Sequence, residues 1–186
     1  MTVSQVARYL SITDASDIEA AMCYLNCTMQ EVRKLTPDQI EHAAERMRDY
    51  QSIPAIYQER LWLNGDEWNR DGKGVEYGTI NDWGKLTGGE YFDVKEFQED
   101  FYANATKILA VLYRPVTQRY GKSYEIQPYN GVDGHEKFGT LPAQYLHGVM
   151  LFFCNVRKNC ARTSLSYLTD KAKEMSSAKS GDGMDS

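Results

Sequence analysis

Four cysteines are the residues whose chemistry depends most on spacing, because paired thiolates bind metals or form disulfides. Cys23 and Cys27 are four positions apart, and Cys154 and Cys160 are six apart. Zinc knuckles instead place about two residues between successive thiolates. Four unevenly spaced cysteines are also too few for a disulfide framework in a chain of 186 residues. The sequence therefore predicts free thiols and no metal site.

Histidines and glycines are the next candidates for catalysis or phosphate binding. The three histidines are His42, His135 and His147, and no HExxH arrangement joins them. Gly72–Gly74 lacks the frame of a phosphate-binding loop, and Gly88–Gly89 is followed by Glu90, which would repel phosphate. We expect the histidines to be solvated or hydrogen-bonded, and we predict no cofactor.

A run of carboxylates is the last candidate for acid-base catalysis. Its members are Asp93, Glu96, Glu99 and Asp100. Charges at these spacings on an amphipathic helix normally form its solvated face. Because no other group suits nucleophilic or metal chemistry, the sequence predicts that the protein is not an enzyme.

Composition limits the possible partners. The chain is 42% apolar and 25% charged, enough for one globular domain with a core. Its net charge of -5 disfavours nucleic acid as a partner, since binders of the phosphate backbone usually have a basic face. No basic leader opens the chain, and no run of about 18 apolar residues follows. We expect a soluble intracellular protein without a membrane segment.

Helix-start signals fill the first fifty residues. Ser16 precedes Glu19 by three, Thr28 precedes Glu31 by three, and Thr36 is followed by proline and then by Gln39. In such capping boxes a hydroxyl and a longer polar side chain satisfy free amides at the helix start. The predicted helices span 15–26, 29–34 and 37–51, with a further short one at 3–10. In the third helix, Ile40, Ala43, Ala44, Met47 and Tyr50 form one apolar face.

The pattern changes after Pro54. Glu59–Trp68 reads as a strand, an Asn-Gly turn and the start of a second strand, and Val75–Ile80 as another short strand. A small antiparallel sheet is therefore expected between two helical blocks.

A long helix is predicted next, from a capping box at Thr87 and Glu90 to about Tyr113. Its apolar stripe comprises Val94, Phe97, Phe101, Ala105, Ile108 and Leu112. Pro115 lacks an amide hydrogen and biases Arg114 away from helical geometry, so the helix should stop at this Arg-Pro corner. The tyrosine-rich segment Tyr124–Gly131 is expected to be extended.

The last third reads as a proline-started helix at 142–158, apolar on two faces, and a final helix at 161–175. The predicted fold is mainly α with a small antiparallel β element, an α+β helical scaffold. Its parts are a helical segment at 1–53, a β-hairpin region at 54–84, a helical segment at 85–175 packed with the rest as one domain, and a disordered tail at 176–186.

Thirteen tyrosines and three tryptophans point to a class of function. These side chains combine a large apolar area with a polar tip, as surfaces that bury against a partner do. Packing at core margins explains any single tyrosine, but the set as a whole favours a protein whose role is interaction.

Several segments between about residues 20 and 170 resemble the tail assembly chaperones of tailed bacteriophages. They are Met29–Ile40, Trp62–Gly65, Leu86–Asp93, Ala110–Pro115, Tyr124–Gly131, Leu141–Pro142 and Gly148–Phe153. The resemblance implies a protein of the host cytoplasm that keeps the tape measure protein soluble, recruits tail tube subunits to it and is absent from the finished virion. The alternative is a structural component of the phage tail, neck or baseplate. Self-association is also possible, because an apolar helix face can pair with its own copy.

A binder of long helical segments needs apolar grooves between its own helices. Candidate partner-binding residues are aromatic or aliphatic and lie near the corner or on the two-faced helix: Tyr91, Phe92, Leu112, Tyr113, Tyr124, Tyr129, Phe152 and Phe153. We expect them to divide between the core and such a groove.

Overall fold

The computed structural model describes residues 1–65, 67–68, 72–80 and 86–151. The chain divides into two units, Met1–Val149 and Met150–Ser186, and nearly all the described residues belong to the first. The predicted helix at 161–175 and the predicted tail at 176–186 lie outside the described residues.

The predicted N-terminal helices are confirmed. They are α1 (Val3–Leu10), α2 (Asp17–Leu25), α3 (Met29–Val32) and α4 (Pro37–Arg48), and a 3-10 turn, η1 (Asp49–Ser52), follows α4. Capping boxes start α2, α3 and α4 as predicted. Sequence reading missed a further box that starts α1, in which Thr2 and Gln5 exchange hydrogen bonds. Each cap contributes about 1 kcal/mol, so these helix starts are fixed locally.

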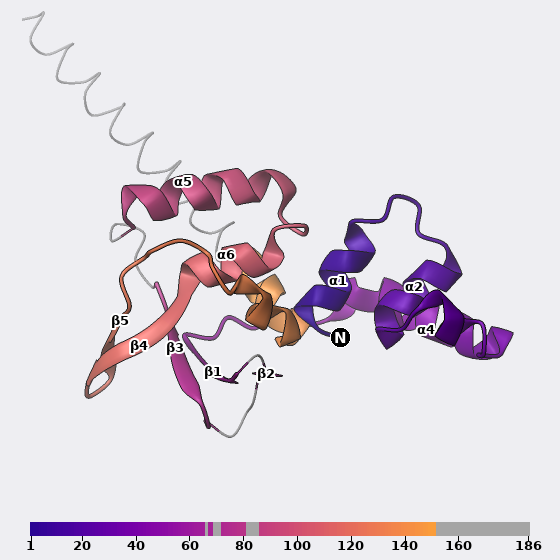
Figure 1. Cartoon of the computed structure of the whole chain (residues 1–186), viewed down its shortest axis with the longest axis horizontal. Helices are drawn as coiled ribbons and strands as arrows, with labels where there is room; N and C mark the ends of the chain where they lie inside the picture. Colours follow the sequence, from indigo (N-terminus) through magenta and orange to yellow (C-terminus); the bar gives the residue numbers. More distant parts are fainter. Residues whose placement is uncertain (66, 69–71, 81–85, 152–186) are drawn as a thin grey trace, which may run out of the picture. The chain divides into compact units, whose positions relative to one another are not determined.

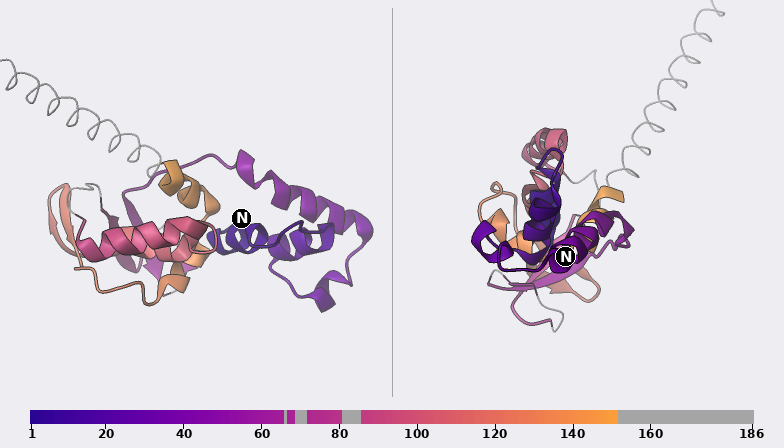
Figure 2. Two further views of the ribbon diagram at one scale, coloured as in Figure 1. Left: turned by 90° about the horizontal axis from the view of Figure 1, so that it is seen from above. Right: turned by 90° about the vertical axis from the view of Figure 1, so that its right-hand side faces the viewer.

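These helices share a small core. Val6 of α1, Ala20 and Cys23 of α2, and Ala44 and Met47 of α4 are buried together, and Ala143 joins them. On the predicted apolar face of α4, Ala43, Ala44 and Met47 are buried, whereas Ile40 and Tyr50 are half-buried. Figures 1 and 2 show α2 and α4 beside one another, away from the strands. Small residues at the contact let these two helices approach closely.

The start of the chain is bound to the start of the last described helix. The Val3 amide donates to the Leu141 carbonyl at 2.8 Å, and the Ala143 amide donates to the Met1 carbonyl at 3.1 Å. Residues 143–151 are helical, in agreement with a proline-started helix after Leu141. Tyr145, Leu146 and Val149 are buried, whereas Leu151 is 56% exposed. The remainder of the predicted helix at 142–158 lies outside the described residues.

A five-stranded antiparallel sheet occupies the middle of the chain, in the order β2-β1-β3-β4-β5. The strands are β1 (Arg60–Asn64), β2 (Glu67–Trp68), β3 (Val75–Thr79), β4 (Tyr113–Tyr120) and β5 (Ser123–Ile126). The predicted strands correspond to β1, β2 and β3. The prediction of a mainly helical scaffold with a small β element is wrong, because β4 and β5 extend the sheet into the range predicted to be helical.

The two faces of the sheet differ in character. Leu61 and Leu63 of β1 and Tyr77 of β3 are buried on one face, where the Tyr77 ring meets Phe138 edge to face at 5.6 Å. On the other face Glu76 of β3 pairs with Arg60 at 3.5 Å, and its carboxylate accepts a bond from Arg119 Nε at 2.8 Å. Successive residues of a strand point to opposite faces. The alternation of apolar and charged side chains along β1 and β3 therefore favours the register in which Leu61 lies opposite Tyr77.

The predicted long helix is divided into two. Helix α5 (Gly88–Phe97) is followed by the 3-10 turn η3 (Gln98–Asp100), and a separate helix α6 (Ala105–Leu112) follows. An Asp100 carboxylate oxygen accepts the Ala103 amide at 3.3 Å, which stabilises the turn. Helix α5 packs on α6, as Figure 1 shows. The predicted stripe is therefore shared between two helices that fold back on each other.

The helix ends before the Arg-Pro corner. Tyr113, with φ -106° and ψ 116°, is already extended, and β4 continues from α6 without a loop (Figure 1). The Ile80 amide, directly after β3, donates to the Leu112 carbonyl at 3.0 Å, and Tyr113 pairs with Thr79 of β3. The predicted end of the helix near Tyr113 is confirmed, and pairing with β3 holds the chain extended from there.

Pro115 lies where β4 changes partner. It is the last residue opposite β3, where it faces Tyr77, and pairing with β5 begins at Val116. Its carbonyl accepts the Gln127 amide at 2.9 Å, and a proline cannot return that bond. The β4–β5 hairpin closes through Gly121 and Lys122, and Gly121 has the positive φ of +62° that a two-residue hairpin turn requires.

We predict that Leu112→Ala destabilises the fold by about 2–5 kcal/mol, the usual cost of a cavity at a buried leucine. Leu112 is 1% exposed, so its apolar contacts lie within the protein. The free energy of unfolding from urea titration measures the loss. Leu25→Ala is the matched control, since Leu25 is 43% exposed. Equal losses for the two variants would contradict the burial of Leu112.

Candidate functional site

The eight candidate partner-binding residues fall into four groups. Tyr91 and Phe92 are 52% and 68% exposed, whereas Leu112 and Tyr113 are each 1% exposed. Tyr124 and Tyr129 are half-buried. Phe152 and Phe153 lie outside the described residues. The structure therefore brings Tyr91 and Phe92 to the surface together and places Leu112 and Tyr113 in the core.

Tyr113 is a core residue with a satisfied hydroxyl. The hydroxyl donates to the Gln58 carbonyl at 2.5 Å. Burial is the main cause that raises the pKa of Tyr113 far above its ordinary value, so the phenol stays protonated and remains a donor. Its hydrogen bond ties the start of β4 to the segment before β1.

Tyr124 lies over the middle of the sheet. A Cβ at Gly78 would stand only 2.2 Å from the Tyr124 ring, so the ring needs a residue without a side chain beneath it. The Tyr124 hydroxyl lies 3.1 Å from the Thr79 carbonyl and 3.2 Å from the Glu59 carbonyl. This tyrosine links β5 with β3 and with the residue before β1, and its hydroxyl is already hydrogen-bonded within the protein.

Tyr129 links the segment after β5 to helix α5. Its hydroxyl donates to the Asp93 carboxylate, and the Arg114 guanidinium lies 5.8 Å from its ring centre. Burial and then the bond to Asp93 raise the pKa of Tyr129 well above its ordinary value. Asp93, one of the carboxylates weighed for acid-base chemistry, is thereby held in a structural contact.

An ion pair anchors the start of α5 to the sheet. Arg114 Nη2 lies 2.6 Å from Glu90 Oε1, and the Glu90 and Arg114 side chains are 1% and 14% exposed. The other carboxylate oxygen of Glu90 accepts the Thr87 amide at 2.5 Å in the capping box. Burial lowers the pKa of the Arg114 guanidinium, and the charge of Glu90 opposes that shift. One carboxylate therefore both caps α5 and fixes it against β4.

Glu90 and Arg114 together are the part of the site that sequence reasoning missed. The sequence indicates Glu90 as a helix cap and as an acid that would repel phosphate, and Arg114 as the residue before Pro115, but it does not pair the two. The available signal was a single arginine within the otherwise apolar stretch 108–116, since a buried charge needs a partner of opposite sign.

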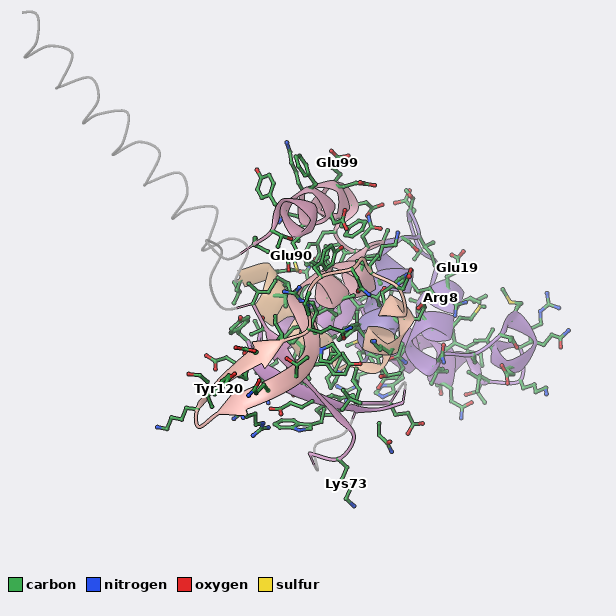
Figure 3. The ribbon with its side chains drawn as sticks, turned by 60° about the vertical axis from the view of Figure 1, so that its left-hand side comes forward. Arg8, Glu19, Lys73, Glu90, Glu99 and Tyr120 are labelled. Atoms are coloured by element: carbon green, nitrogen blue, oxygen red, sulfur yellow. The ribbon has the colours of Figure 1, made fainter. Side chains whose placement is uncertain are left out.

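Tyr91 and Phe92 face away from this anchor. The buried residues of α5 are Glu90 and Val94, and in Figure 3 Glu90 points toward the rest of the fold while Glu99, in the turn η3, lies on the outward side. The two rings meet edge to face with centres 5.9 Å apart. We call Tyr91 and Phe92 the aromatic surface, because they form a contiguous exposed aromatic pair. The helix that carries them is bound to β4 on its opposite side by the Glu90–Arg114 ion pair.

The remaining chemical candidates have ordinary structural roles. His135 Nδ1 lies 2.8 Å from the Thr106 hydroxyl, His147 Nδ1 lies 3.1 Å from the Ile53 carbonyl, and His42 is exposed. These placements match the prediction of hydrogen-bonded or solvated histidines. Cys23 and Cys27 are free thiols, and burial raises the pKa of Cys23. Among the described residues no three histidine, cysteine or carboxylate side chains are grouped for a metal ion.

Hollows in the described part of the chain include one of about 520 Å³, bordered by Glu59, Thr79, Arg114, Lys122 and Tyr124, among others. Another, of about 390 Å³, is bordered by Met1, Arg46, Asp49 and Gln144, among others. Neither brings together a nucleophile and a base, so the aromatic surface is the better candidate for function.

Comparison with protein-family models, curated proteins and solved structures found no match to this chain. Across residues 1–65, 67–68, 72–80 and 86–151, no helix has the length and apolar character needed to cross a membrane. The fold and the site together define an α+β protein that presents an exposed aromatic pair on an anchored helix.

We predict that Arg114→Met destabilises the protein by about 3 kcal/mol or more, because it leaves the Glu90 carboxylate buried without a counter-charge. Arg48→Met, which removes an exposed ion pair with Asp17, should change stability little. Chemical unfolding compares the two variants with the unaltered chain. The double variant Glu90→Gln/Arg114→Met should recover part of the loss, and equal effects of the two arginine variants would refute the anchoring role.

Proposed function

We propose that this protein is a non-enzymatic tail assembly chaperone of a tailed bacteriophage. In this role it binds the tape measure protein in the host cytoplasm, keeps it soluble and helps to recruit tail tube subunits. The proposal concerns a binding function, and the aromatic surface on α5 is its docking site.

The observation that carries the proposal is the exposure of Tyr91 and Phe92, at 52% and 68%, on a helix anchored by a buried ion pair. Large aromatic side chains are favoured at the centre of protein interfaces, where they bury much area with little loss of conformational freedom. The anchor fixes the helix before binding, so less ordering is needed when a partner arrives.

The phage assignment is supported by the resemblance of segments such as Leu86–Asp93 and Tyr124–Gly131 to that family. In the structure these two segments meet, because Tyr129 contacts Asp93 and lies beside Gly89. A long, helix-rich tape measure protein exposes apolar stripes before assembly, which suits a binder with an exposed aromatic pair.

We predict that Tyr91→Ser/Phe92→Ser weakens retention of the tape measure protein by about 30-fold, the effect of losing a hot spot worth ~2 kcal/mol. A pull-down at varied bait concentration gives the apparent affinity. The matched control is Tyr120→Ser, because Tyr120 is 53% exposed at the tip of the β4–β5 hairpin (Figure 3). All variants should melt at the temperature of the unaltered chain.

Failure of the unaltered chain to retain either the tape measure or the tube protein would overturn the chaperone proposal. Mass spectrometry of purified particles tests the structural alternative, since stoichiometric amounts of this protein in mature virions would favour a tail, neck or baseplate component.

A further inference from the structure

Helix α5 and the 3-10 turn η3 that follows it carry a charge pattern beside the aromatic surface. Glu96 of α5 and Glu99 of η3 follow Phe92 by four and seven residues, and all three side chains are exposed. Residues four apart lie on one face of an α-helix, and residues three apart lie above one another in a 3-10 turn. The row runs for about 10 Å along the axis, so this exposed face is aromatic at the start of α5 and acidic from Glu96 into η3.

Among the residues that the structure describes, no salt bridge neutralises the negative charges of this row. Neither Glu96 nor Glu99 belongs to an ion pair of the described residues, whose salt bridges involve other side chains. Lys95 is the one exposed cation between Gly88 and Asp100 and is likewise outside those salt bridges. Lys107 of α6 is engaged elsewhere, with its amino group 3.1 Å from the Asn104 side-chain oxygen and 5.3 Å from the Phe97 ring.

An apolar partner segment covering Tyr91 and Phe92 would bring its own flanking residues to Glu96 and Glu99. Acidic flanking residues would be repelled, and neutral ones would desolvate the carboxylates without compensation. Lysine or arginine there would form ion pairs at the rim of the contact and raise the rate of association.

We infer that the partner of the aromatic surface is a basic amphipathic helix. It lays an apolar stripe on Tyr91 and Phe92 and places lysine or arginine side chains, about one and two turns along, against Glu96 and Glu99. The inference rests on the proposed function in taking this face of α5 as the docking surface, and it adds the chemical class of the bound segment.

Two synthetic helical peptides with the same leucine stripe test the inference, one flanked by lysines and the other by glutamates at the same positions. Isothermal titration against the full chain should show binding of the lysine peptide at least about tenfold tighter than that of the glutamate peptide, as two rim ion pairs would produce. The difference should shrink as the salt concentration rises.

Charge reversal locates the effect. Glu96→Lys/Glu99→Lys should reverse the preference, so that the glutamate peptide binds more tightly. The control Glu41→Lys/Glu45→Lys makes the same charge change on α4 at two exposed positions outside the salt bridges, and it should leave the preference for the lysine peptide in place. Circular dichroism verifies that both variants keep the helical content of the unaltered chain.

The outcomes separate the inference from the proposed function. Equal binding of the two peptides, no binding of either, or a control that reverses the preference would overturn the basic-helix inference. If the tape measure protein were still retained through Tyr91 and Phe92, the chaperone proposal would survive that result. Conversely, Tyr91→Ser/Phe92→Ser could abolish binding of the lysine peptide while the unaltered chain fails to retain the tape measure protein. That result would support a basic helix as the partner class and overturn the chaperone role.

Discussion

The ion pair between Glu90 and Arg114 is the contact on which the arrangement of α5 depends. A carboxylate that is 1% exposed has left water almost completely, and only a counter-charge and hydrogen bonds offset that cost. Arg114 supplies the counter-charge, and the Thr87 amide donates one of the hydrogen bonds. Because Arg114 belongs to β4 and Glu90 to α5, the same contact fixes a helix to a sheet. Tyr129 adds to it by bonding Asp93 and lying near Arg114.

This anchor explains how one short helix serves two environments. Its inner side carries Glu90 and Val94, and its outer side carries Tyr91, Phe92 and Glu96. Apolar and charged residues therefore occur on both sides. A helix of this kind has no apolar face that would position it by burial alone. A specific polar contact orients it instead, and the aromatic pair is thereby left free for a partner.

Local features of the fold were predictable, and long-range ones were not. The capping boxes of α2, α3, α4 and α5 each lie within four residues, so the sequence displays them directly. At the end of α6, by contrast, the Leu112 carbonyl accepts a hydrogen bond from the Ile80 amide, far away in the chain. Strand β4 also lacks the alternation of a half-buried strand, since Thr117 to Tyr120 are all exposed. For the site, Tyr91 and Phe92 were named from their type, but their separation from buried Leu112 and Tyr113 required the packing.

The direct passage from α6 into β4 has a mechanical consequence. With no loop at Leu112 and Tyr113 to absorb motion, a rotation of α6 about its axis must twist the first residues of β4, where Arg114 lies. A load applied to α5 would therefore be transmitted through the arginine to the sheet and along the backbone to α6. These three elements would respond to a pull as a single stiff unit, so the aromatic surface would keep its orientation under load.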